Sequence, residues 1–317
     1  MLERSHRATI AGELEQAVGQ LERAGVTAEA RREATLLWAA VTGASPGEVW
    51  LRRDRTAPPE VERFRDAVAR RSSGVPFAYA VGRISFRRLE LRLDPRALIP
   101  RPETEGLVEL VLASMRQALR DSLTVAGNPK GLPDGRGKRE TLGVVADVGT
   151  GCGCIALSLA VEGNFDRVIA VERHAEAAAL ARENVALVRP PVPVEVRVGD
   201  LLAPLTGERC RAVVANPPYL TDEEYAAIDP SVRLFEPREA LVSGPDGLDA
   251  TRALLAGAQG VLEPGGLLAL EIDERRADAV RTLALASGWT HVTVHEDLFG
   301  RPRYALARAS PVPTFRP

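Results

Sequence analysis

The first part of the chain follows a helical pattern of apolar and polar positions. Between Ile10 and Leu21, apolar residues recur at three- and four-residue spacing, as they do on one face of a helix. Ser45 followed by Pro46 is typical of a helix start, with serine as the N-cap and proline at the first helical position. Because no stretch alternates as a strand does, the pattern predicts a small helical bundle over residues 1–82.

After residue 143, short apolar runs alternate with helical stretches. The last two runs are joined only by Asp297–Pro302, which is too short for a parallel crossover. We therefore expect an α/β fold: a doubly wound, seven-stranded, Rossmann-like sheet, mostly parallel, with an antiparallel pair at its end. The runs are Val144–Val148, Val168–Val171, Val194–Val198, Ala212–Ala215, Leu267–Ile272, His291–Val294 and Arg303–Ala307.

Between these two regions, two short apolar runs predict a β-hairpin. We therefore interpret the chain as a helical domain at 1–82, a hairpin linker at 83–97 and the α/β domain at 98–317. Prolines flank Arg101 on both sides and restrict the backbone, so a helix can begin only after Pro102.

That helix is expected to run over about Glu103–Leu119. Residues 128–140 follow it and are rich in proline, glycine and basic side chains, which is typical of a surface loop. This loop is either a solvated insertion or a segment that meets an RNA or an acidic partner.

The charge balance argues against a protein that lives on nucleic acid. With 41 basic and 43 acidic residues the net charge is -2, whereas such proteins show a basic excess. The three cysteines are an odd number without a C-x-x-C pair, which favours a reducing compartment. The N-terminus lacks the apolar segment of a signal peptide, and no run could span a bilayer. We expect a cytoplasmic monomer that binds neither DNA directly nor a membrane.

A glycine-rich turn follows the first predicted strand. In Asp147–Gly153, every second residue from Gly149 is glycine, which lets the backbone turn tightly and approach a ligand closely. The turn lies beyond a carboxyl strand end, where open α/β sheets bind their ligands. Alone it is a weak signal, because many nucleotide-binding folds carry one. Cys152 and Cys154 lack partners at metal-ligand spacing, so no metal site is expected.

Two carboxylates sharpen this interpretation. Glu172 ends the second strand, where an acidic side chain can accept hydrogen bonds from both ribose hydroxyls. Asp200 follows the third strand and can accept from an adenine amino group, while Leu201 packs on the ring. The spacing G-x-G-x-G, with no lysine for phosphates, fits a sulfonium nucleoside better than a dinucleotide. A purely structural turn with incidental acids is the alternative.

The fourth strand ends in the tetrapeptide Asn216-Pro217-Pro218-Tyr219. The prolines remove two backbone donors and leave carbonyl groups free, and Asn216 adds a side-chain acceptor. Together they can hold an –NH2 group by both hydrogens, and Tyr219 offers an aromatic face for a flat acceptor. The segment therefore predicts methyl transfer to a planar amide or amine nitrogen, although a bare Pro-Pro pair can also simply end a buried strand.

Short segments spread in order over residues 30–307 together form a pattern that is typical of one protein family. They are Pro76–Tyr79, Gly82, Phe86, Leu98–Glu105, Asp147–Leu157, Ala170–Glu172, Asn184, Gly199-Asp200, Asn216–Tyr219, Glu236-Pro237, Ala240-Leu241, Gly244 and Asp246–Leu248. This ordered set resembles the HemK-like protein-(glutamine-N5) methyltransferases that modify peptide-chain release factors. Leu98–Glu105 resembles the family signature I-P-R-P-[DE]-T-E. Two departures are Glu271–Arg276, where the family often has E-x-G-x-x-Q, and the apparent insertion at 128–140.

The resemblance implies that the helical domain docks a release factor and that the α/β domain methylates the glutamine of its Gly-Gly-Gln loop. The methyl donor implied is S-adenosylmethionine, with S-adenosylhomocysteine as product. The predicted cofactor contacts are Asp147, Gly149, Thr150, Gly151, Cys152, Gly153, Glu172, Asp200, Leu201 and Asn216. The predicted catalytic and substrate contacts are Asn216, Pro217, Pro218 and Tyr219, joined for substrate binding by Arg101 and Pro102.

Other functions share parts of this pattern. The same tetrapeptide serves adenine-N6 methyltransferases of DNA or RNA, because adenine also presents a flat –NH2. Methylation of a ribosomal-protein glutamine is an alternative that the I-P-R-P segment does not separate. A non-catalytic cofactor-binding adaptor is a further alternative, but the intact tetrapeptide argues against it, so the sequence favours an enzyme.

Overall fold

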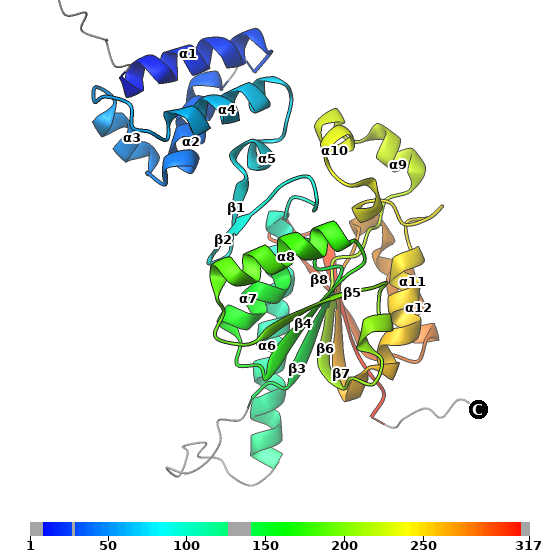
Figure 1. Cartoon of the computed structure of the whole chain (residues 1–317). Helices are drawn as coiled ribbons and strands as arrows, with labels where there is room; N and C mark the ends of the chain where they lie inside the picture. Colours follow the sequence, from blue (N-terminus) through cyan, green and yellow to red (C-terminus); the bar gives the residue numbers. More distant parts are fainter. Residues whose placement is uncertain (1–8, 27–28, 126–140, 312–317) are drawn as a thin grey trace, which may run out of the picture. The chain divides into compact units, whose positions relative to one another are not determined.

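The computed structural model describes residues 9–26, 29–125 and 141–311, and Figure 1 traces the elements they form. By its contacts the chain divides into two compact units. The helical unit comprises Met1–Arg83 together with Asp229–Phe235, and the sheet unit comprises Ile84–Ile228 and Glu236–Pro317. The surface loop predicted at 128–140 lies outside the described residues.

In the helical unit, the first four helices each bury one face against a shared apolar core, as the predicted bundle requires. The rings of Trp38 and Phe64 meet edge to face there, with centroids 4.7 Å apart. The Ser45 side chain caps its helix as predicted, by accepting a hydrogen bond from the backbone N–H of Glu48. The helices are α1 (Ile10–Arg23), α2 (Ala30–Thr42), α3 (Pro46–Arg52), α4 (Val61–Ser72), α5 (Phe77–Val81) and α10 (Pro230–Phe235).

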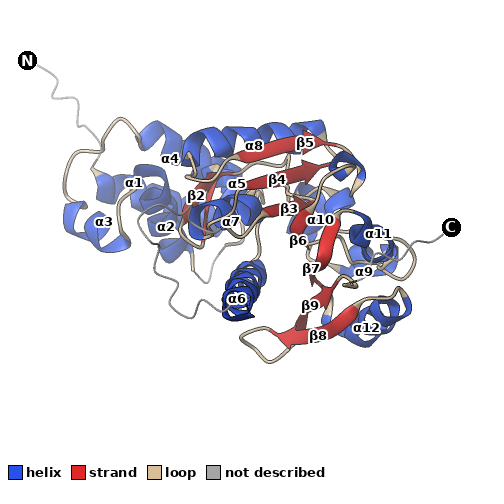
Figure 2. Ribbon diagram, turned by 90° about the horizontal axis from the view of Figure 1, so that it is seen from below, coloured by secondary structure: helices blue, strands red, loops and turns tan. Residues whose placement is uncertain are grey.

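The sheet unit is built on a seven-stranded sheet with the order β5-β4-β3-β6-β7-β9-β8 among the described residues, which Figure 2 shows edge to edge. The first five of these strands run parallel, and β9 is antiparallel to both β7 and β8, which confirms the predicted doubly wound sheet. The strands are β3 (Val144–Val148), β4 (Arg167–Glu172), β5 (Val194–Val198), β6 (Cys210–Ala215), β7 (Leu262–Glu271), β8 (Thr290–Glu296) and β9 (Pro302–Arg308).

Helices cover both faces of this sheet, with α6, α7 and α8 on one side and α11 and α12 on the other (Figure 1). The central strands β3, β4 and β6 are therefore almost wholly buried, as their unbroken apolar runs require. The helical segments are α6 (Pro102–Val125), α7 (Cys154–Glu162), α8 (Ala175–Val188), α9 (Asp222–Ala227), α11 (Asp249–Gly257), α12 (Ala277–Ala286) and the 3-10 turns η1 (Ala203–Leu205), η2 (Arg238–Ala240), η3 (Ala258–Gly260) and η4 (Glu274–Arg276).

A two-stranded hairpin, β1 (Arg83–Phe86) and β2 (Leu89–Arg92), precedes α6. The buried side chain of Asn184 on α8 joins β2 to the glycine turn: it accepts from the Arg92 N–H at 2.8 Å and donates to the carbonyls of Arg92 at 3.0 Å and Cys152 at 2.8 Å. The helix α6 runs past the predicted end at Leu119, because no glycine or proline interrupts it there and Gln117 donates to Asp121 one turn later.

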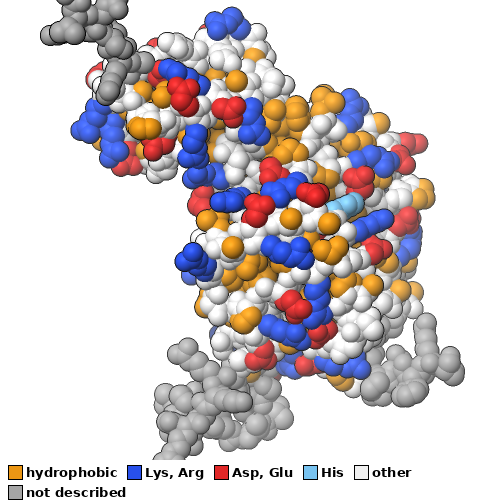
Figure 3. All heavy atoms as spheres, viewed as in Figure 1, with side chains coloured by type: hydrophobic (Ala, Val, Ile, Leu, Met, Phe, Trp, Pro, Cys, Tyr) orange, Lys and Arg blue, Asp and Glu red, His pale blue; other side chains and the backbone are white. Residues whose placement is uncertain are grey.

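Within the described ranges, no helix is both long and apolar enough to cross a membrane. In the same ranges, no three His, Cys, Asp or Glu side chains gather as a metal site would need. On the face shown in Figure 3, acidic and basic side chains are interspersed rather than gathered into one basic surface.

Candidate active site

A cavity of about 690 Å³ lies in the sheet unit at the carboxyl ends of β3, β4, β5 and β6. The segments that follow these strands line it, as is typical of ligand sites in open α/β sheets. The predicted site residues that line it are Gly149, Gly151, Glu172, Asp200, Leu201, Asn216, Pro217 and Pro218.

The glycine turn after β3 uses backbone conformations that side chains rarely adopt. Gly149, Gly151 and Gly153 have φ angles of 77°, 55° and 89°, all in the left-handed region. The backbone N–H groups of Gly149 and Thr150 both donate to the Val171 carbonyl at 2.9 Å, which fixes the turn against β4. A Cβ on Gly149 would meet no atom within 4 Å, so its backbone faces open space that a ligand can occupy.

Glu172 at the end of β4 is held by the backbone on both oxygens. Its Oε2 accepts from the Gly151 N–H at 2.9 Å and its Oε1 from the His174 N–H at 3.0 Å. An ionised carboxylate can accept about four hydrogen bonds, so each oxygen keeps a lone pair for the cavity that Glu172 lines. The geometry fits two vicinal hydroxyl groups, which supports the ribose contact predicted from the sequence.

Four of the predicted cofactor residues belong to the turn but do not line the cavity: Asp147, Thr150, Cys152 and Gly153. The Asp147 Oδ2 accepts from the Thr150 hydroxyl at 2.6 Å and from the Ala156 N–H at 3.0 Å, which ties the turn to the start of α7. Burial raises the pKa of Asp147 to about 7, against the hydrogen bonds from Thr150 and Ala156. These residues shape the turn.

Asp200 and Leu201 follow β5 on the adjoining wall of the cavity. Asp200 is exposed, and its carboxylate lies 3.9 Å from the Arg173 guanidinium. Leu201 has a φ angle of 45°, a left-handed conformation that is rare for a branched side chain. Such strain is typical of positions where a ligand needs a particular side-chain direction.

The acceptor tetrapeptide leaves β6 beside the glycine turn, because β3 and β6 are paired up to Val148 and Ala215. The Asn216 Nδ2 donates to the Thr104 hydroxyl at 3.2 Å, which directs its Oδ1 away from Thr104. In the described part of the chain, no donor is bonded to the carbonyl oxygens of Pro217 or Pro218. The segment thus presents the Asn216 Oδ1 and the carbonyl oxygens of Pro217 and Pro218 as acceptors.

The structure places the other predicted substrate residues next to the cavity lining instead of within it. Arg101 donates to the Glu236 carboxylate at 2.7 Å, and the same carboxylate accepts from the Ile99 N–H at 3.1 Å. Pro102 is the first residue of α6. Tyr219 is largely buried, and burial together with the nearby Glu271 carboxyl raises the pKa of its hydroxyl to about 12.

Two residues that support the tetrapeptide were not predicted as site residues from the sequence. The backbone N–H groups of Tyr219 and Leu220 donate to the Leu241 carbonyl, at 3.2 and 2.8 Å, so the segment after η2 fixes the end of the tetrapeptide. Thr104 supports Asn216, as above. The ordered matches at Ala240-Leu241 and in Leu98–Glu105 were a signal for these segments, but nothing in the sequence alone showed their contacts.

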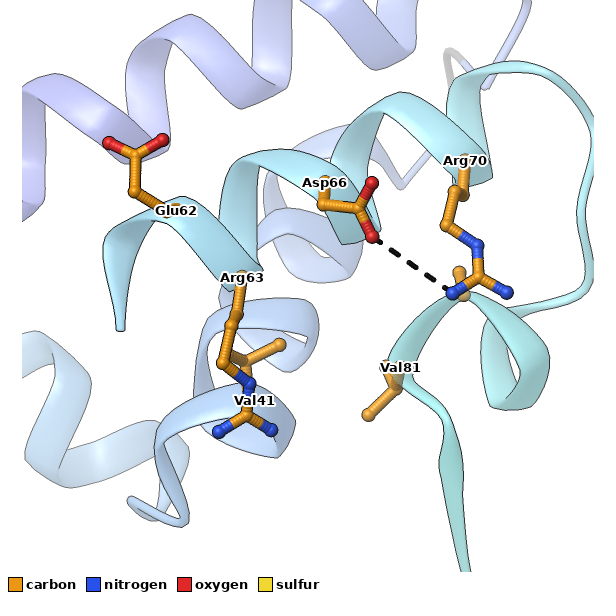
Figure 4. Close-up of a pocket in the computed structure, with 7 residues that line it drawn as sticks. Val41, Glu62, Arg63, Asp66, Arg70 and Val81 are labelled. Atoms are coloured by element: carbon orange, nitrogen blue, oxygen red, sulfur yellow. Dashed lines mark ion pairs between the residues drawn. The ribbon is translucent and has the colours of Figure 1, made fainter. Parts of the chain in front are cut away.

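The helical unit has a cavity of its own, of about 460 Å³ (Figure 4). Charged side chains of α4 line it, with Val41 and Val81 between them. Asp66 and Arg70 approach to 4.0 Å, one helical turn apart, so part of this charge is internally compensated.

A doubly wound sheet with a glycine turn, an acid at the second strand end and Asn-Pro-Pro-Tyr at the fourth defines an S-adenosylmethionine-dependent methyltransferase. Family models support both units: one described as PrmC N-terminal domain matches residues 14–82, and one described as Methyltransferase small domain matches residues 137–236. The chain belongs to the release factor glutamine methyltransferase family.

Relatives of that name align over almost the whole chain. Release factor glutamine methyltransferase of Cereibacter sphaeroides is 38% identical over 93% of this chain and 96% of its own length. That of Moorella thermoacetica is 38% identical over 94% and 98%. Among solved structures, the hMettl16 catalytic domain in complex with MAT2A 3'UTR hairpin 6 has a TM-score of 0.50 at 15% identity, covering 81% of this chain and 83% of that one, a likeness that shows the fold alone.

Proposed function

We propose that this protein transfers the methyl group of S-adenosylmethionine to the side-chain amide nitrogen, N5, of the glutamine in the Gly-Gly-Gln loop of peptide-chain release factors. The observation that carries the proposal is the orientation of Asn216, whose Nδ2 is occupied by Thr104 while its Oδ1 is left for an incoming –NH2 group. The names of the curated relatives support the choice of substrate.

The acceptor chemistry follows from this arrangement. A glutamine amide is a poor nucleophile because its nitrogen lone pair is delocalised into the carbonyl group. The Asn216 Oδ1 accepts one hydrogen of the amide, and the free Pro217 carbonyl accepts the other. Gripping both hydrogens fixes the direction of the nitrogen and favours its rehybridisation. Correct placement, with reacting atoms about 3–3.5 Å apart, supplies much of the rate enhancement.

The methyl donor fits the other half of the cavity. S-adenosylmethionine supplies an electrophilic methyl group on a sulfonium sulfur, so no base is needed to create the electrophile. Glu172 would accept from the ribose hydroxyls, Asp200 would accept from the adenine amino group, and Leu201 would pack on the adenine ring. The open space beside the Gly149 backbone would leave room for the methionine portion. Transfer would break the bond between sulfur and the methyl carbon and leave S-adenosylhomocysteine. The amide nitrogen, which would carry both the new methyl group and its two hydrogens, would then be strongly acidic and would lose one proton to solvent.

The rest of the proposal concerns the partner. The helical domain, residues 1–82, docks the release factor, and residues 83–97 link it to the methyltransferase domain at 98–317. The mixed charge lining the cavity on α4 suits a polar protein surface. The protein acts as a monomer in the cytoplasm, and its three cysteines, all buried and unpaired, are compatible with a reducing compartment.

The test is a transfer assay with methyl-labelled S-adenosylmethionine. Separate reactions contain a release factor, its Gly-Gly-Gln loop variant with Gln→Ala, a mixture of ribosomal proteins, and duplex DNA. We expect label only on the unchanged release factor, and fragment mass analysis should place it on that glutamine. Label on ribosomal protein or DNA without label on the release factor would overturn the proposal.

A further inference from the structure

Asn216 stands at the end of a row of polar side chains that leads into the protein. Its Nδ2 donates to the Thr104 hydroxyl at 3.2 Å. The same hydroxyl faces the carboxyl group of Glu271 at the end of β7, where a hydrogen bond from it favours the ionised carboxylate. Thr104 is 2% exposed and Glu271 1%. Thr104 belongs to α6 and Glu271 to β7, and each is more than fifty residues from Asn216 along the chain.

While Glu271 is ionised, hydrogen bonds between Asn216, Thr104 and Glu271 can be donated in only one direction, from Asn216 toward Glu271. A carboxylate can only accept, so the single hydrogen of the Thr104 hydroxyl points to Glu271. The hydroxyl oxygen must then accept from Asn216, which can offer only its Nδ2 hydrogens. The Asn216 Oδ1 is therefore forced toward the cavity, which is the orientation that a glutamine –NH2 group needs.

Glu271 is poorly placed for a merely structural acid. Its Oε2 is buried and has no hydrogen-bond partner, although such atoms are normally satisfied. The groups that face it are Arg303 and Arg101, which favour the ionised form, Glu103, which opposes it, and the hydroxyls of Tyr219 and Tyr304. Keeping a half-satisfied carboxyl group at this point costs stability, which favours a functional reason for it.

We propose that Thr104 and Glu271 are positioning residues that hold the Asn216 amide with its Oδ1 facing the acceptor nitrogen. This inference rests on the proposed function of the tetrapeptide. It adds to the cofactor and substrate contacts a second set of residues that touch neither ligand and act only through Asn216.

The inference makes the reaction pH-dependent. Burial raises the pKa of Glu271 to about 7, against the Thr104 hydrogen bond and Arg303. Protonated Glu271 can donate to Thr104, which frees the Thr104 hydrogen to bond the Asn216 Oδ1. The Asn216 amide can then rotate and present –NH2 to another –NH2 group. Activity should therefore fall as pH drops through about 7, and the full rate should be reached above that value.

The first experiment replaces Thr104 with valine, which keeps the shape but removes the hydroxyl. With release factor as substrate, we expect Thr104→Val to lower kcat about 10- to 100-fold, as small losses of alignment do, and to change the Kd for S-adenosylmethionine less than about twofold. Thr104→Ser should restore most of kcat. Thr251→Val, the same exchange at a buried threonine of α11 that does not line the cavity, should retain wild-type kcat.

The second experiment uses Glu271→Gln, whose amide oxygen can still accept from Thr104 but does not titrate. We expect the acid limb of the kcat profile near pH 7 to disappear, with at most about a tenfold loss of kcat at pH 8. An unchanged acid limb would show that Glu271 does not position Asn216. A normal kcat in a folded Thr104→Val protein would show that the Thr104 hydroxyl does not position it either. Failure of the wild-type protein to label release factor would instead count against the proposed function, so the two failures are distinguishable.

Discussion

The two halves of the cavity are built in different ways. In the cofactor half, the carboxylates are held by neighbouring segments of β3 and β4: Glu172 accepts from Gly151 and His174, and Asp147 accepts from Thr150. In the acceptor half, Asn216 is supported from far along the chain, by Thr104 on α6. A ligand site whose carboxylates are held by adjacent strand ends carries most of its support within its own motifs, whereas a site supported from a distance depends on the correct packing of the whole sheet unit.

The comparison is tested most strongly at Asn216. We expect Asn216→Ala to lower kcat about 10²- to 10³-fold, because it removes an acceptor aimed at the reacting nitrogen. The thermal midpoint should change little, because in the described chain the Asn216 side chain is tied to the rest of the fold by one hydrogen bond, to Thr104. Rates measured with saturating S-adenosylmethionine and release factor give the answer. The control is Asn164→Ala, at an exposed position between α7 and β4. If Asn216→Ala kept a kcat within threefold of wild type, the proposed role of Asn216 as an acceptor for the amide would be wrong.

How far the sequence could predict the molecule follows the same division. The strands of the sheet were predicted because buried parallel strands are unbroken apolar runs, and the glycine turn and Glu172 because they are adjacent to such runs. The tetrapeptide was found for the same reason. Its support could not be found, because the pairing of Asn216 with Thr104 and of Arg101 with Glu236 spans more than a hundred residues and arises only in the tertiary structure.

The sequence also did not predict which unit a short segment belongs to when that unit differs from the one formed by the residues on either side of it. The segment Asp229–Phe235, which contains α10, belongs by its contacts to the helical unit, although the residues on both sides belong to the sheet unit. Its six-residue helix has no buried side chain to mark an apolar face. Likewise, the burial of the Thr150 and Cys152 side chains within the glycine turn is decided by side-chain direction, which the motif does not encode.

The next largest effect is expected in the cofactor half. Glu172→Ala should raise the Kd for S-adenosylmethionine about 10- to 100-fold, since hydrogen bonds to a charged group are worth about 1.5–3 kcal/mol each. It should also lower the thermal midpoint, because the N–H groups of Gly151 and His174 lose their partner. Titration calorimetry measures the affinity, with Glu263→Ala on the far end of β7 as the control. If Glu172→Ala left the affinity unchanged but reduced kcat like Asn216→Ala, the proposed division of labour between the halves would be wrong.

The smallest effect on the reaction is expected from substitution of Asn184, which should lower the stability of the fold without changing kcat or cofactor affinity. Its side chain makes three hydrogen bonds, to both backbone groups of Arg92 and to the Cys152 carbonyl, and it does not line the cavity. Asn184→Ala leaves these backbone groups, of which the Cys152 carbonyl is buried, without their side-chain partner. The free energy of unfolding should therefore fall by about 1–3 kcal/mol, measured by urea denaturation. At 25 °C, kcat and the Kd for S-adenosylmethionine should stay within about twofold, because Glu172 and the Val171 carbonyl still hold the turn. A larger rise in Kd than in Glu172→Ala would mean that the cofactor half also depends on distant support, and the contrast with the acceptor half would not hold.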